Sequence, residues 1–216
     1  MQKITSIKVN AYQTDYHQII DQAGIAVGQP YARWAGQQKS FSFSFRKNYQ
    51  VSSVDLDLDP KSGKAFIKVH ERVFAGFVFY KNAWHRLNRD SNVGNYVSVP
   101  DGRSPIYTGF NLHSDYFKQT VKNYFKLGQL SRSAVSQIIL VSSGSRTKEI
   151  AIVMNDGNLV YTSPASIGKL ELYPQMAAVI RQRNLNRGVI DLISGNFARP
   201  FNDQDQKVLN DADNRR

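Results

Sequence analysis

The chain has 216 residues, of which 41% are hydrophobic and 12% aromatic, a composition typical of a folded protein rather than a disordered one. It contains no cysteine, which excludes disulfides, thiolate metal sites and a nucleophilic thiol. Lys and Arg outnumber Asp and Glu by 28 to 17, and this excess is spread along the chain rather than gathered in one basic arm. Such a spread weakens a nucleic-acid-binding interpretation and fits an anionic surface, such as lipid headgroups or a polyanionic wall.

The first third of the chain predicts one small α/β layer with the order β-α-α-β-β. Asp15 is a candidate helix cap, and Gly24 is a candidate stop for the helix that follows it. The segment 39–49 alternates like a strand, yet Phe41, Phe45 and Tyr49 also share a helical stripe, and we predict a short helix. The predicted strands are residues 4–10, 51–59 and 65–73, and the predicted first helix is residues 16–23.

The remainder predicts a second, mixed α/β domain with an antiparallel-rich sheet and two amphipathic helices, so the fold class is α+β. A hairpin is predicted to turn at Lys81-Asn82, and Asn155-Asp156-Gly157 is a strong hairpin turn. Residues 89–95 and 99–105 are predicted to be loops. The other predicted elements are helices at 115–127 and 170–184 and strands at 137–142, 149–154, 159–162 and 188–201. We therefore predict domains at 3–73 and 74–201, followed by a disordered polar tail at 202–216.

The sequence contains no complete motif for catalysis or metal binding. The segment 55–63 opens like a calcium loop with Asp55, Asp57 and Asp59, but Pro60 and Phe66 stand where glycine and a bidentate acid are required. Alternation of a half-buried strand explains the three aspartates better. The histidines are scattered without metal-ligand spacing, and no nucleophile elbow occurs. We expect a non-enzymatic protein that needs no metal or other cofactor.

Three lysines form a stripe on the predicted helix 115–127. Lys118, Lys122 and Lys126 follow one another at intervals of four residues and therefore share one face. A solvated helix face is the default interpretation, and a contact with acidic lipid, wall polymer or an acidic protein is the alternative.

The order of several segments resembles the DivIB/FtsQ family of bacterial division proteins. The stretch "KITSIKVN" (3–10), the helix ending in Ala-Gly-Ile, and "IKVHERVFAGF" (67–77) resemble its POTRA domain and the entry to its second domain. "PIYTGF" (105–110) and "GVIDLISGNFARPF" (188–201) resemble the second domain, and the closing segment is more similar to the Gram-positive DivIB branch. Proteobacterial members have Arg-Tyr after Asp-Leu, where this chain has Ile193 and Ser194, so a contact made by that arginine is in doubt.

This resemblance implies a single-pass protein of the cell membrane with this region on the extracellular side, at the division septum, and a membrane anchor outside this chain. It also implies a non-enzymatic scaffold of the divisome that binds FtsL and DivIC/FtsB-type partners and coordinates septal cell-wall synthesis. Two alternatives remain. One is a basic nucleic-acid-binding protein contacting phosphates through "SFRKNYQ" (44–50) and "RQRNLNR" (181–187). The other is a POTRA-type chaperone of secretion or membrane assembly, which ordinarily has tandem POTRA repeats.

The last predicted strand is the candidate partner site, because the resemblance places it at a sheet edge to which a partner adds a strand. Strand alternation puts Ile193, Gly195, Phe197 and Arg199 on one side, with Arg199 available to an acidic residue of the partner. We expect the tail after Phe201 to matter far less. The candidate partner-binding residues are Arg187, Leu192, Ile193, Ser194, Gly195, Asn196, Phe197, Arg199 and Phe201.

Overall fold

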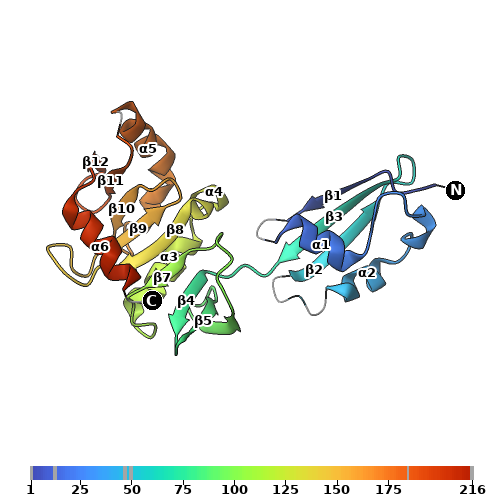
Figure 1. The fold of residues 1–216 in the computed structure, drawn as a ribbon, viewed down its shortest axis with the longest axis horizontal. Helices are drawn as coiled ribbons and strands as arrows, with labels where there is room; N and C mark the ends of the chain where they lie inside the picture. The colour runs from blue at the N-terminus through green and yellow to red at the C-terminus, as the bar shows by residue number, and fades with distance from the viewer. Residues whose placement is uncertain (1, 12–13, 46–47, 49–50, 184, 215–216) are drawn as a thin grey trace. The chain divides into compact units, whose positions relative to one another are not determined.

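The computed structural model describes residues 2–11, 14–45, 48, 51–183 and 185–214. These residues form two compact units, Met1–Val73 and Phe74–Arg216, each with its own hydrophobic core (Figure 1). No helix in the described ranges is long and apolar enough to cross a membrane.

Unit 1 is a three-stranded sheet in the order β1-β3-β2, with two helices against one face (Figure 1). Asp15 accepts hydrogen bonds from the amides of His17 and Gln18, and Gly24 ends α1 in the left-handed conformation at φ 68°. The described order is therefore β-α-α-β-β, as predicted. The elements are β1 (Ser6–Asn10), α1 (Tyr16–Ala23), the 3₁₀ turn η1 (Tyr31–Arg33), α2 (Gln38–Ser44), β2 (Val51–Leu58) and β3 (Lys64–Glu71).

The short helix α2 settles the ambiguity of the aromatic segment. Phe41 and Phe45 are both buried and pack against the sheet, whereas Phe43 points outward and is 66% exposed. Tyr49, the third aromatic of the expected stripe, lies outside the described residues. On β2, Val54 is fully buried while Asp55 and Asp57 are exposed, as alternation predicted.

Unit 2 is built around a nine-stranded mixed sheet in the order β12-β11-β10-β9-β8-β7-β4-β5-β6. The strands are β4 (Gly76–Tyr80), β5 (Ala83–Leu87), β6 (Val93–Val97), β7 (Ile106–Thr108), β8 (Val135–Leu140), β9 (Ile150–Met154), β10 (Leu159–Thr162), β11 (Gly188–Asp191) and β12 (Phe197–Pro200). The helical elements are α3 (Asp115–Phe125), α4 (Gln129–Ser133), the 3₁₀ segment η2 (Ile167–Leu172), α5 (Tyr173–Gln182) and α6 (Asp203–Asp213).

Both faces of this sheet carry packed side chains, because successive residues of each strand alternate between them. Val160 and Ile190 belong to the larger core, to which α3, η2 and α5 contribute. Tyr161 and Val189 belong to a second cluster, which α6 covers with Val208 and Ala212. The last strands of the sheet are thus enclosed between helices on both sides.

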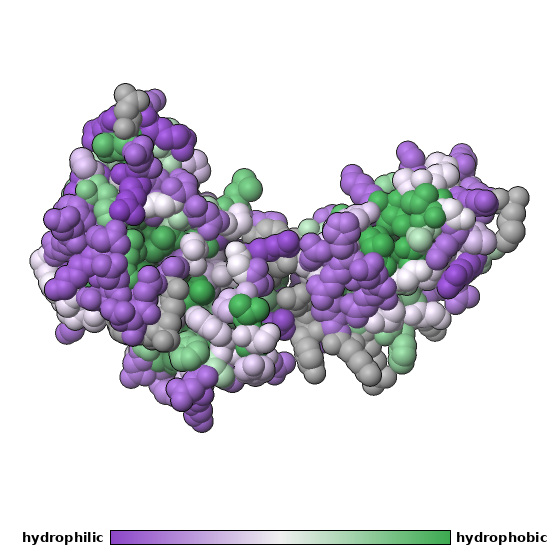
Figure 2. Space-filling model, in the orientation of Figure 1, coloured by the Kyte–Doolittle hydropathy of each residue, from purple (hydrophilic) through white to green (hydrophobic). Residues whose placement is uncertain are grey.

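The structure differs from the sequence expectation at the C-terminus. Residues 203–213 form the helix α6, so the prediction of a disordered tail is wrong for them. A capping box between Asn202 and Asp205 starts this helix, and Val208 and Ala212 are buried. The outer surface of α6 is hydrophilic, which is why its sequence reads as polar (Figure 2).

The predicted last strand, 188–201, is also wrong as a single element. It is a hairpin of β11 and β12 joined by a turn over residues 192–196. In addition, β6 begins within residues 89–95, which were expected to be loop, and β7 lies at residues 106–108, where no element was predicted. The start of the predicted helix 170–184 belongs to the 3₁₀ segment η2, and α5 itself begins at Tyr173, with Pro174 in its first turn.

Candidate partner-binding edge

Strand β12 is the free edge of the unit 2 sheet. It pairs antiparallel with β11, with Val189 opposite Arg199 and Asp191 opposite Phe197, and it ends the strand order. Strand β11 is interior, since its other side pairs in parallel with β10. Only β12 can therefore accept a further strand at this end of the sheet.

The outward main-chain groups of β12 can be assigned from the neighbouring hydrogen bonds. The Gly188 amide donates to the Asn158 side chain at 2.8 Å and so faces β10 rather than β12. By alternation, Val189 and Asp191 face β12 and bond to their register partners. Ala198 and Pro200 consequently turn their main-chain groups to the outer edge, where Ala198 has an amide donor and Pro200 has none.

Two arginines occupy the outward carbonyls of this edge. Arg183, at the C-terminal end of α5, donates from Nη1 to the Ala198 carbonyl at 3.1 Å. Arg199 donates from Nη1 to the Pro200 carbonyl at 2.9 Å. Because an unpaired strand edge invites unwanted pairing, cationic side chains over its acceptors protect it.

The turn between β11 and β12 is held by the buried carboxylate of Asp191. Its Oδ1 accepts the amides of Ile193 and Ser194, both at 2.9 Å, and its Oδ2 pairs with Arg146 at 2.6 Å. Burial alone would raise the pKa of Asp191, but these donors outweigh burial and hold its pKa below the usual value. At the tip, Ile193 and Phe197 are 37% and 46% exposed.

Behind β12, the carboxylate of Asp205 joins the edge strand to α6. Arg199 binds it through both guanidinium nitrogens, at 2.6 and 2.8 Å, and the Tyr161 hydroxyl donates to it at 2.9 Å. Burial would raise the pKa of Asp205, but Arg199, the Asn202 amide and Tyr161 together lower it. Burial and the bond to Asp205 raise the pKa of Tyr161.

The structure therefore separates the predicted partner-binding residues into two groups. Leu192 is buried, Arg199 is bound to Asp205, and the Arg187 guanidinium lies 3.9 Å from the centre of the Phe201 ring. These side chains dock the hairpin and α6 within the protein, so Arg199 is not free to bind an incoming acid as the sequence suggested. Arg187 is exposed in spite of this contact, and the other exposed members are Ile193, Ser194, Gly195, Asn196 and Phe197.

Sequence reasoning did not identify Asp191, Asp205 or Arg183 as parts of this site. A local sequence pattern could have identified Asp205, because it stands three residues after Asn202, the spacing of a helix capping box. The roles of Asp191 and Arg183 arise from contacts between distant segments, which no local pattern encodes.

The lysine stripe is exposed as predicted. Lys118, Lys122 and Lys126 all lie on the outer side of α3 or at its end, and Lys118 is within 3.8 Å of Asp115. Among the described residues, no cluster of three or more histidine or acidic side chains could hold a metal ion.

Comparisons with known proteins identify relatives of this chain. No family model matches the chain. The cell division protein DivIB of Oenococcus oeni is 38% identical over 209 residues, which cover 96% of this chain and 76% of that protein. DivIB of Leuconostoc kimchii is 29% identical over 199 residues, covering 91% and 78%. A solved structure, the major extracytoplasmic domain of DivIB from Geobacillus stearothermophilus, shares 17% identity and covers 52% of this chain and 97% of its own, with a TM-score of 0.42.

The fold and the edge site define an α+β protein in which a POTRA-type unit precedes a mixed-sheet unit ending on a free strand. The identity to the Oenococcus oeni protein over most of both chains is decisive for the family. The chain belongs to the DivIB/FtsQ family of cell division proteins.

Proposed function

We propose that this protein is a non-enzymatic scaffold of the divisome, at the septum and on the extracellular side of the membrane. It binds FtsL and a DivIC/FtsB-type protein, and one of them adds a strand to β12. The free outer edge of β12, with the Ala198 amide turned outward beside exposed Ile193 and Phe197, is the observation that carries this proposal.

The chemistry of the edge also constrains the partner segment. An added strand needs acceptors opposite the Ala198 amide, and its own donors must replace Arg183 at the Ala198 carbonyl. Arg181 and Arg183 are exposed in the last turn of α5 and at its end, so a displaced Arg183 is well placed to pair with a carboxylate. A strand with an acidic residue near its centre and apolar residues facing Ile193 and Phe197 fits this edge.

Proline at position 198 tests the strand-addition step. The change Ala198→Pro removes the outward amide but keeps Phe197 and Arg199, whose main-chain groups bond to β11. We expect binding of the FtsL–DivIC pair to weaken about tenfold or more, as the loss of one main-chain bond plus a steric clash predicts. Ser194 and Asn196 are poor positions for this test. The Ser194 amide is used by Asp191, and Asn196 has a φ of 54° that proline cannot adopt.

The matched control is Tyr96→Pro on β6, the strand at the opposite edge of the same sheet. Tyr96 lies opposite His85, whose main-chain groups face β4, so the Tyr96 amide is directed outward as that of Ala198 is. This substitution should leave binding unchanged. The folded state of each variant is checked by its two-dimensional amide NMR spectrum. Normal binding by a folded Ala198→Pro variant contradicts strand addition, whereas equal losses in both variants indicate a general effect on the sheet.

A further inference from the structure

The short helix α4 carries the most exposed large apolar side chain among the described residues, Leu130, of which 87% is accessible to solvent. Single apolar side chains are common on protein surfaces and ordinarily need no functional explanation. Leu130 differs in its setting, because the helix that presents it is fixed in place and basic side chains lie at the neighbouring end of α3.

Hydrogen bonds fasten α4 on two sides. Arg132 donates from Nη1 to the Phe125 and Leu127 carbonyls, at the end of α3, at 2.9 and 2.8 Å. At the start of α4, the Gly128 amide donates to the Glu171 carboxylate. A side chain on such a support loses little conformational freedom when it binds a surface.

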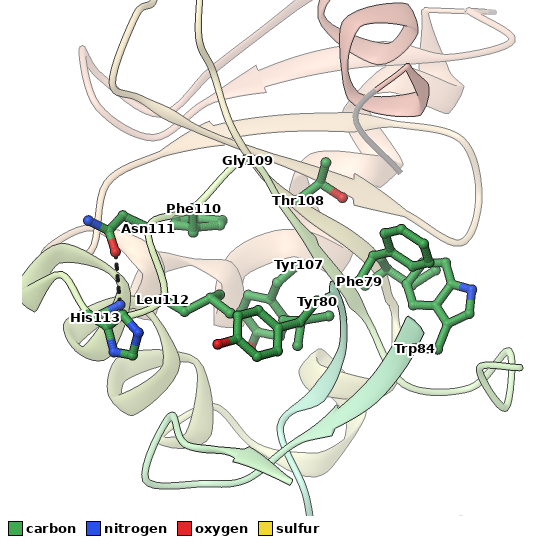
Figure 3. A pocket seen from close by; sticks show the side chains of 12 residues that line it. Phe79, Tyr80, Trp84, Tyr107, Thr108, Gly109, Phe110, Asn111, Leu112 and His113 are labelled. Atoms are coloured by element: carbon green, nitrogen blue, oxygen red, sulfur yellow. Dashed lines mark hydrogen bonds between the residues drawn. The ribbon is translucent and has the colours of Figure 1, made fainter. Parts of the chain in front are cut away.

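Helix α3, which bears the basic residues, is also fixed at its start. Figure 3 shows the loop that precedes it, beside a pocket of about 290 Å³, with the Asn111 side chain accepting the His113 amide at 3.0 Å. Ser114 then caps the helix by accepting the Phe117 amide at 3.2 Å. The positions of α3 and α4 relative to each other and to the sheet are therefore well defined.

Cations gather where α3 meets α4. Lys122 and Lys126 are exposed, and within the described ranges neither forms an ion pair. The guanidinium of exposed Arg89 lies 4.9 Å from the centre of the Phe125 ring. The Glu171 carboxylate already accepts two hydrogen bonds from the start of α4. The helix dipole favours cations at a C-terminal end, so the charge alone would not indicate a partner, but the dipole does not explain a projecting leucine beside it.

We propose that α4 and the end of α3 contact a lipid bilayer with anionic headgroups. Leu130 enters the boundary between the headgroups and the acyl chains. Lys122, Lys126 and Arg89 bind the headgroup phosphates. This contact does not rest on strand addition at β12, which uses none of these residues.

The projection of Leu130 favours a bilayer over other anionic partners. Lipid chains rearrange around a projecting side chain, and its removal from water is favourable. A soluble or wall-bound polyanion offers charge to the lysines but no apolar medium to the leucine. A folded acidic protein would need a hollow that matches the leucine.

Partitioning onto vesicles tests the role of the leucine. The whole chain is sedimented with vesicles of phosphatidylcholine and phosphatidylglycerol at increasing lipid concentration. We expect Leu130→Ala to bind about fivefold more weakly, the effect of an aliphatic side chain partly withdrawn from water. This ratio should persist at high salt, whereas the loss caused by changing lysines disappears. The matched control is Val99→Ala, which changes another apolar side chain, 70% exposed and outside α3 and α4, and it should bind normally.

The absence of cysteine from the chain allows a direct measurement of insertion. Leu130→Cys provides a single thiol for the environment-sensitive fluorophore acrylodan, and Val99→Cys provides the control position. We expect vesicles to shift the emission to the blue for the label at position 130 alone. Amide NMR spectra establish that each variant is folded.

Three results would overturn the proposal. They are unchanged partitioning of Leu130→Ala, equal emission shifts at the two labelled positions, and an equal loss of Leu130→Ala binding to polyglutamate. The last result would indicate an acidic protein or polymer in place of a bilayer.

Discussion

Asp205 connects three parts of the molecule through a single buried carboxylate. It binds Arg199 of the edge strand, Tyr161 of β10 and the Asn202 amide at the start of α6. Removing the carboxylate leaves a guanidinium and a hydroxyl without their partner in a poorly solvated site. The change Asp205→Ala is therefore expected to lower the free energy of unfolding by about 3 kcal/mol, measured by urea denaturation.

The neighbouring acid Asp203 supplies the control for this prediction. It is also in the first turn of α6 but is exposed, so Asp203→Ala should change the free energy of unfolding by less than about 0.5 kcal/mol. Equal losses of unfolding free energy in the two variants would mean that the negative charge at the start of α6, rather than the buried Arg199–Asp205 pair, stabilises the protein.

The two buried carboxylates also predict how stability depends on pH. Folding lowers the pKa of both Asp191 and Asp205, so the unfolded chain takes up protons at a higher pH than the folded one. Their stabilisation is complete above the unfolded pKa of about 4 and is lost as the pH falls through the folded pKa values. Urea midpoints at decreasing pH should fall over that window, and Asp191→Asn should reduce the slope. An unchanged slope in that variant contradicts the role given to Asp191.

The helix α6 is held on the sheet by one apolar face. Its two buried apolar residues, Val208 and Ala212, cover the second cluster of the sheet. Val208→Ala is expected to cost about 2 kcal/mol from lost methyl burial and the cavity left behind. Lys207→Ala, on the exposed side, should cost almost nothing. Thermal unfolding measures both, and a Val208→Ala variant as stable as the parent would show that α6 is not packed in solution.

The exposed lysine stripe of α3 is a candidate contact for an anionic surface. If the stripe contacts an anionic surface, changing Lys118, Lys122 and Lys126 together to glutamine should weaken binding to phosphatidylglycerol vesicles several-fold at low salt. High salt should erase the difference. A triple change of exposed Lys61, Lys64 and Lys68 in unit 1 is the control. Equal binding by all three proteins identifies the stripe as a solvated helix face.

Elements with a strong local signal were predictable from sequence. Helix α1 has both its predicted bounds because a cap and a left-handed glycine enclose it, and β10 follows a recognisable hairpin turn. Strand β6 contains Gly94 and Asn95 and forms only through pairing with β5. The split of the last strand depends on Asp191 being buried beside Arg146, a contact over 45 residues that the local sequence does not encode.

The candidate site was predictable to the level of the segment but not of the individual side chain. The apolar stretch 188–201 and its place near a sheet edge could be inferred from sequence and resemblance. The sequence could not show whether the Arg199 side chain faces solvent or packs inside the protein. That depends on α6, a helix whose hydrophilic outer residues make its sequence resemble a polar tail.

For the whole molecule, the two cores predict independent folding. Unit 1 buries its own aromatic and aliphatic side chains, as does unit 2, and the chain divides after Val73. We expect residues 74–216 alone to give the same amide NMR signals for β8 to β12 as the whole chain does. Widespread shifts, or failure of this fragment to fold, would contradict the assignment of two independent domains.

Binding at the sheet edge is the central claim for the whole molecule, and amide hydrogen exchange at Ala198 tests it most directly. In the free protein this amide faces outward and should exchange quickly, whereas Val189 and Asp191 are protected by the β11–β12 ladder. On binding the FtsL–DivIC pair, we predict that exchange at Ala198 slows strongly while exchange at the outward amide of Tyr96 on β6 does not change. Saturating partner that leaves Ala198 exchange unchanged would contradict strand addition at β12.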